Sequence, residues 1–149
     1  MSVSLFTKEK DITDMGYGEF RRFRIIVAEV FDKEYAQLYK KIPADPSQNR
    51  IIDEKINNLI KKKQYMQNDN KYVIEFLHQP DCDGKISPDA CKKIYDLLKN
   101  DKRDIKFGYL YEITLKEIKK ELLNCYNKQL WLQWCWPHHF FYSKNVNIV

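Results

Sequence analysis

The residues best suited to chemistry in this sequence lie in one short acidic segment, Asp81-Cys82-Asp83-Gly84. Two carboxylates flank a thiol, and the Asp-Gly pair favours a tight turn. With Gly84 at the sixth position of a calcium-binding loop, Asp81 and Asp83 fall at the third and fifth positions. Positions one and twelve carry no carboxylate, so such a loop would have too few oxygen ligands. We therefore interpret the segment as a turn that orders the chain, with Asp81 and Asp83 as its metal-ligand candidates.

Two other sets of donors could bind a metal. His78 with Asp81 and Asp83 has the donor types that suit magnesium, manganese or zinc, and a metal-dependent hydrolase is therefore one alternative. The second set could bind zinc. Its ligands would be Cys135, His138 and His139, together with either Cys125 or the pair Cys82 and Cys91. Its spacings match no standard zinc motif. The sequence therefore favours a non-enzymatic protein and predicts no cofactor.

Basic and aromatic residues alternate in the segment Phe20–Arg24. A helix that presents Arg21, Arg22 and Arg24 to solvent could bind phosphates, so nucleic-acid binding is a second alternative. Lysines and tyrosines also alternate between residues 109 and 120.

The C-terminal end is rich in aromatic residues. Trp131 and Trp134 are expected to share the buried side of a helix. Trp136, His138 and His139 are then the better candidates for a partner surface, since aromatic residues are enriched in binding hot spots.

The composition bounds the fold and the compartment. The chain has 149 residues, 44% of them hydrophobic, which is enough to bury a core. It has 4 glycines, and so few argue against many tight turns and for helices. The formal charge of +5 is mild and spread along the chain. The N-terminal residues do not have the pattern of a signal peptide, and no apolar run reaches the ~20 residues that span a bilayer. We expect a cytoplasmic protein with reduced cysteines and no membrane contact.

Apolar spacing and capping residues predict the elements. One helix is expected over 17–41. A second starts at Pro46 with Asp45 as N-cap and Gln48 in the capping box. Another starts after Ser87, and a long one covers 111–134. Residues 1–15 are predicted as a flexible arm or a short strand, 72–77 as either strand or helix, and 136–149 as an aromatic tail. The fold class is mainly α: a single compact domain of four to five helices with a minor β element.

The order of these features is similar to that of a known family. A glycine-aromatic opening leads into Phe20–Arg24, and His78, the Asp-Cys-Asp-Gly turn and Cys91 in the next helix follow. This resembles a family of small, uncharacterised bacterial and phage proteins that share such a turn and a helix with a cysteine. In the family pattern a histidine lies two residues before the first aspartate, whereas His78 lies three before Asp81. The family has no function to carry over.

Taken together, these features predict a small cytoplasmic binding or interaction protein, with an origin in a mobile element as one option. The expected partner is another protein or a small anionic ligand, with nucleic acid as a further alternative.

Overall fold

The computed structural model describes residues 2–42, 46–108 and 112–136. Within them, a four-stranded antiparallel sheet has the order β2-β1-β6-β3, and β4 and β5 form a separate pair. The strands are β1 (Ser2–Phe6), β2 (Asp11–Gly16), β3 (Asp83–Ile86), β4 (Lys106–Phe107), β5 (Ile113–Thr114) and β6 (Leu132–Cys135). The helices are α1 (Tyr17–Phe31), α2 (Lys33–Tyr39), α3 (Pro46–Lys63), α4 (Lys71–His78), α5 (Pro88–Leu98) and α6 (Leu115–Lys128), with a short 3-10 helix, η1 (Tyr65–Gln67).

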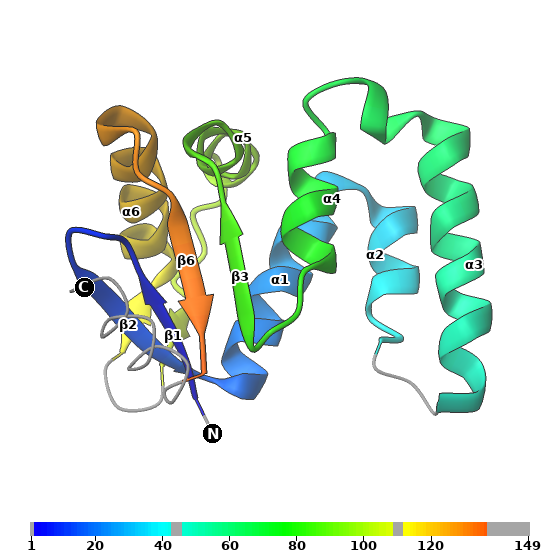
Figure 1. Cartoon of the computed structure of the whole chain (residues 1–149), viewed down its shortest axis with the longest axis horizontal. Helices are drawn as coiled ribbons and strands as arrows, with labels where there is room; N and C mark the ends of the chain where they lie inside the picture. Colours follow the sequence, from blue (N-terminus) through cyan, green and yellow to red (C-terminus); the bar gives the residue numbers. More distant parts are fainter. Residues whose placement is uncertain (1, 43–45, 109–111, 137–149) are drawn as a thin grey trace, which may run out of the picture.

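The helices form two groups around the sheet. In Figure 1, α1, α5 and α6 lie on one side of the sheet, and α2, α3 and α4 lie beyond its β3 edge. Trp134 of β6 is fully buried between Phe20 of α1 and Phe76 of α4, with ring centroids 5.7 and 5.5 Å away. The prediction of a mainly α fold with a β element is confirmed, but the described residues contain six α-helices and a larger β part than expected.

The first strands form a hairpin at the edge of the sheet. Val3, Leu5 and Met15 point into the core, and the Ser4 hydroxyl donates to the Asp14 carboxylate at 2.6 Å. Of the two predictions for residues 1–15, the strand is therefore the correct one, because alternate apolar residues on both strands are buried.

The helix predicted over 17–41 is interrupted at Asp32. This residue is extended, with φ −163° and ψ 120°, and its carboxylate accepts hydrogen bonds from the amides of Glu34 and Tyr35. Lys63 Nζ, at 2.6 Å, and the Tyr65 hydroxyl also bind it. Burial acts to raise the pKa of Asp32, but these hydrogen bonds outweigh it and the pKa is lowered. An N-cap aspartate thus ends one helix and begins the next.

The other helix starts agree better with the sequence. Pro46 is the first residue of α3, while Asp45 and the Gln48 side chain lie outside what the structure describes. Residues 72–77 are helical, within α4. The Ser87 hydroxyl accepts from the Ala90 amide at 3.2 Å, which confirms the predicted cap of α5.

The helix predicted over 111–134 is the largest error. It begins at Leu115, after a capping box between Thr114 and Glu117, and ends at Lys128. Gln129 takes a left-handed conformation (φ 56°), after which the chain becomes β6, a central strand of the sheet. Burial then alternates with period two, so Trp134 is buried but Trp131 is 45% exposed. The expectation that both tryptophans share a buried helix side is therefore wrong.

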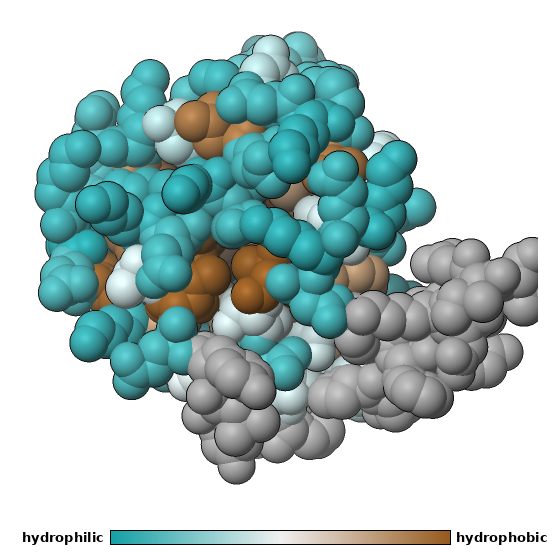
Figure 2. All heavy atoms as spheres, turned by 90° about the vertical axis from the view of Figure 1, so that its left-hand side faces the viewer, coloured by the Kyte–Doolittle hydropathy of each residue, from teal (hydrophilic) through white to brown (hydrophobic). Residues whose placement is uncertain are grey.

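Seen from the side on which α6 and β2 lie, the surface is mostly hydrophilic with separate small apolar areas (Figure 2). Across the described ranges, none of the helices combines the length and the apolar character needed to cross a bilayer.

Candidate functional site

The acidic turn is fixed to the rest of the protein by hydrogen bonds at four successive residues. Arg24 Nη1 donates to the Gln79 carbonyl and to Asp81 Oδ1, both at 2.8 Å. Trp134 Nε1 donates to the Pro80 carbonyl at 3.0 Å. The backbone amide of the residue after β6 donates to the Cys82 carbonyl at 3.1 Å. These bonds account for the turn without any bound ion.

The Gln79 side chain adds a further connection. Its amide donates to the Lys85 carbonyl at 2.7 Å, and its carbonyl accepts from the Lys85 amide at 2.9 Å. The side chain thus pairs with the outer edge of β3 as a neighbouring strand would, which satisfies backbone groups that an edge strand leaves unpaired.

Arg24 is the charged centre of this region and is only 3% exposed. Its guanidinium lies over the rings of Phe20, Phe76 and Trp134, at 4.7 to 5.3 Å from the centroids. Burial lowers the pKa of Arg24, while Tyr39 and Asp81 favour its charged form. A cation enclosed by aromatic rings and paired with one carboxylate is a structural arrangement.

Tyrosines surround the ion pair. A hydrogen bond to Asp81, followed by burial, raises the pKa of Tyr17, and burial raises the pKa values of Tyr35 and Tyr39. The Tyr35 hydroxyl shares a hydrogen bond with His78 Nε2, and burial lowers the pKa of His78. The tyrosines therefore stay protonated and His78 stays neutral at pH 7, so these groups contribute hydrogen bonds.

Gly84 has a different role from the one that the turn suggested. A glycine in a tight turn of this kind is predicted to have a positive φ, but Gly84 lies in β3, its φ is not positive, and it is paired with Trp134 of β6. A Cβ at this position would lie less than 3.0 Å from the Trp134 indole. The glycine is therefore required because the indole crosses directly over its backbone.

The two metal-ligand candidates are used separately. Asp81 is paired with Arg24, whereas Asp83 is exposed on β3. Within the part of the chain that the structure describes, no group of three His, Cys, Asp or Glu side chains is placed to hold a metal. His78 is bonded to Tyr35, so the structure gives no support to a site built on His78, Asp81 and Asp83.

The predicted arginine surface is divided as well. Arg24 is buried, which contradicts its assignment to a solvent-facing surface. Arg22 is exposed, lies 5.2 Å over the Phe107 ring and pairs with Glu19 at 3.3 Å. Arg21 is partly buried and donates to the Lys40 carbonyl at 3.0 Å.

The predicted surface near the C-terminus is only partly described. Trp136 is partly buried and packs against the core, so it is not the most exposed tryptophan. His138 and His139 lie outside the described residues, as does the region 140–142.

All four cysteines lie in the described part of the chain, and none is disulfide-bonded. Cys91 and Cys125 are buried next to each other between α5 and α6. A hydrogen bond to Cys125, together with burial, raises the pKa of Cys91. Burial raises the pKa of Cys135 to about 12. Cys82 is partly exposed on the turn.

The structure also shows a groove between α5 and α6 with a volume of about 650 Å³. We call it the lysine groove. Its lining residues are Tyr95, Lys99, Lys102, Thr114, Lys116, Glu117, Lys119, Lys120 and Leu123. Tyr95 near the end of α5, with Lys99 and Lys102 just after this helix, supplies one wall, and the N-terminal half of α6 supplies most of the other. Five lysines thus meet along one surface with one acidic residue among the described lining.

The acidic residues in and around the lysine groove already have partners. Glu117 accepts from the Thr114 amide and hydroxyl in the capping box. Asp101 is bound by Arg103 through two nitrogens, at 3.0 and 2.7 Å, which lowers the pKa of Asp101. The N-terminus of α6 adds a positive partial charge. Among the lysines, Lys99 pairs with Asp96 at 3.8 Å, and Lys119 Nζ donates to the Asp101 carbonyl at 2.6 Å. With five lysines and one glutamate in its described lining, the groove still carries an excess of positive charge.

Three of the five groove lysines can be grouped from the sequence alone. Lys116, Lys119 and Lys120 have the spacing of one helix face, and that signal was available. The addition of Lys99 and Lys102 depends on the antiparallel contact of α5 with α6, which no local pattern encodes.

Comparison of the chain with known proteins gave no match: no family model, no curated protein and no solved structure is significantly similar to it. The resemblance to small bacterial and phage proteins therefore stays a prediction.

Proposed function

We propose that this protein is a non-enzymatic binding protein for a phosphate-bearing polymer and that the lysine groove is its binding surface. The observation that carries the proposal is the meeting of five lysines along one groove, two of them just after α5 and three on α6, where Glu117 and Asp101 are already hydrogen-bonded to other groups. A polyanion that releases its counterions to such a surface gains free energy without any sequence-specific contact.

The side chains of the groove favour nucleic acid over a protein partner. Lysine is depleted in protein interfaces, where tryptophan, tyrosine and arginine dominate the hot spots. The groove has lysines in place of arginines and one tyrosine, Tyr95. Even with Lys99 paired with Asp96, the lysines along this open groove exceed what one small anion would neutralise. Nucleic acid, an alternative from the sequence, thus becomes the first choice, with its site moved from α1 to the lysine groove.

A cytoplasmic location is part of the proposal. The absence of a disulfide among the four cysteines supports it, because oxidising compartments favour disulfides.

The test is binding of a fluorescently labelled single-stranded oligothymidylate, followed by anisotropy at several salt concentrations. Lys116→Glu combined with Lys120→Glu should weaken binding about 10-fold or more at low salt. The salt dependence, as the slope of log K against log salt, should become shallower by about 1.4 if both lysines contact phosphates.

The matched control is Lys61→Glu combined with Lys62→Glu, which changes the net charge equally at exposed positions of α3. Equal loss of binding in both double variants would mean that only net charge matters, and it would contradict the assignment of the groove. No binding by the unmodified protein at low salt would contradict the function itself.

A further inference from the structure

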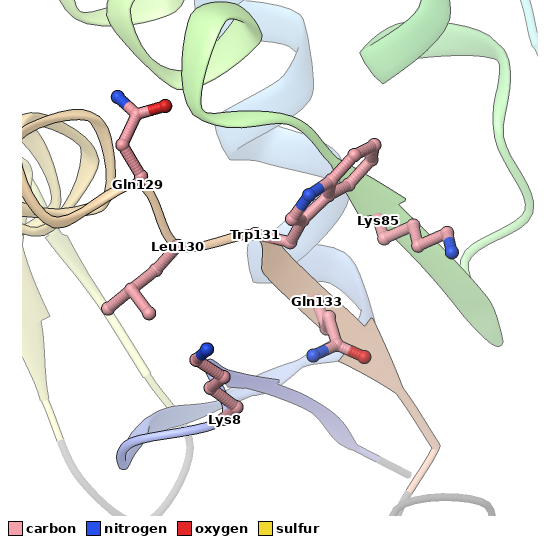
Figure 3. A pocket seen from close by; sticks show the side chains of 6 residues that line it. All are labelled: Lys8, Lys85, Gln129, Leu130, Trp131 and Gln133. Atoms are coloured by element: carbon pink, nitrogen blue, oxygen red, sulfur yellow. The ribbon is translucent and has the colours of Figure 1, made fainter.

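A second hollow lies at the start of β6, around the exposed Trp131. Its volume is about 220 Å³, and Figure 3 shows its lining side chains: Lys8, Lys85, Gln129, Leu130, Trp131 and Gln133. They come from four segments of the chain: the β1–β2 turn, β3, the connection from α6 to β6, and β6 itself. We call this hollow the Trp131 pocket.

The exposure of Trp131 has a local structural cause. Gln129 reverses the chain in a left-handed conformation, and its side-chain amide donates to the Tyr126 carbonyl at 2.6 Å. Leu130 then enters the core, and the next side chain points outward. An indole that is 45% exposed in a folded chain leaves apolar ring surface in water, a free-energy cost that a stacking ligand would remove.

The neighbours of the indole are cations and amides. Lys85 Nζ lies 5.3 Å from the Trp131 ring centroid, and Lys8 lines the opposite part of the pocket. No carboxylate is present among the described lining residues. The Gln133 amide can both donate and accept, as the polar edge of a nucleobase requires. The volume lies below the ~300–1,000 Å³ that enclose a drug-sized ligand, so it suits a single ring system.

We propose that the Trp131 pocket binds a nucleobase by stacking, with Lys8 and Lys85 on the adjoining phosphates. This inference rests on the proposed function and deepens it, since it specifies that the phosphate polymer is single-stranded nucleic acid with unpaired bases. A combination of aromatic platforms and cationic surfaces is how such strands are bound without strong sequence preference.

The experiment compares labelled oligothymidylate with an abasic oligonucleotide of the same length and charge, by anisotropy on the full chain. Trp131→Ala should weaken binding of oligothymidylate roughly 5- to 150-fold and leave binding of the abasic strand unchanged. Trp131→Phe keeps a stacking surface and should restore most of the affinity. Met66→Ala, which removes an exposed apolar side chain on η1, should change neither affinity.

The outcomes separate this inference from the proposed function. Equal binding of both strands to the unmodified protein, or an equal loss of both in Trp131→Ala, would overturn base stacking and leave the lysine groove intact. Lack of binding of either strand at low salt would overturn the proposed function and this inference with it.

Discussion

At the acidic turn, a buried arginine is paired with a carboxylate inside the protein, whereas the lysine groove gathers five cations along an open surface with one carboxylate in its described lining. Arg24 has a carboxylate, a carbonyl and three aromatic rings around it. The groove lysines lie on α6 and just after α5; Lys99 pairs with Asp96, while Glu117 and Asp101 are bound by other groups. The first arrangement stabilises the fold and the second opposes it, because like charges repel.

This difference shows how site-like residue types can mislead. The Asp-Cys-Asp-Gly turn contains every residue type that a metal site or a reactive thiol needs, and its hydrogen bonds to Arg24 and Trp134 use those residues for structure. The lysines match no motif, yet they gather on one surface. A stability measurement can therefore distinguish the two regions before any ligand is known.

The largest effect is expected at Arg24. Arg24→Ala removes the partner of Asp81 and empties the space between three aromatic rings, so the free energy of unfolding should fall by about 3–5 kcal/mol. Chemical denaturation would measure it. Arg22→Ala, a change at an exposed arginine of the same helix, should cost less than about 1 kcal/mol.

If Arg24→Ala does not fold, Asp81→Asn provides the same test with the shape preserved, because it leaves the buried guanidinium without its counter-charge. Near-equal stability of the Arg22 and Arg24 variants would show that the turn is held by other contacts and that the comparison is wrong.

The next largest effect is expected at Gly84. Gly84→Ala places a methyl group against the Trp134 indole and should destabilise the protein by about 1–3 kcal/mol. Gly18→Ala is the matched control, since nothing lies within 4 Å of its added Cβ. As a helical position, it should gain up to about 1 kcal/mol. Thermal melts of both variants would decide; a harmless Gly84→Ala would mean that Trp134 does not cross that backbone.

Features that depend on residues close together in the sequence were predicted, whereas features that depend on distant residues were not. The start of α5 after Ser87 depends on neighbouring residues and was predicted correctly. The break at Asp32 depends on Lys63 and Tyr65, which are distant in sequence, and β6 becomes a strand only because β1 and β3 pair with it. Arg24 looked like one of three surface arginines, since its burial depends on Asp81 and the rings around it. Tertiary contacts decided each of these cases.

The next prediction concerns thiol labelling, which tests how accessible the acidic turn is in the native protein. Cys82 is partly exposed, whereas Cys91, Cys125 and Cys135 are buried. A maleimide should modify Cys82 of the native protein while the other three remain unmodified, because their reaction requires local unfolding. Mass spectrometry of the digested protein would locate the label, and Cys82→Ser should leave the native protein unlabelled. Early labelling of Cys91 would show that α5 is placed wrongly.

The smallest change in stability is expected in the lysine groove, and its sign should be opposite to that of the changes at the acidic turn. Lys116→Glu with Lys120→Glu relieves repulsion among five lysines and places carboxylates near the N-terminus of α6, where they are favourable. The free energy of unfolding should rise by up to about 0.5 kcal/mol at low salt. At ~1 M salt the Debye length shrinks to ~3 Å, so the gain should vanish. Denaturant titrations at both salt concentrations would measure it.

A loss above about 1 kcal/mol would mean that these lysines form structural ion pairs, as Arg24 does. A gain that disappears with salt, together with lost oligonucleotide binding, would indicate that the protein gives up stability at this surface in order to bind.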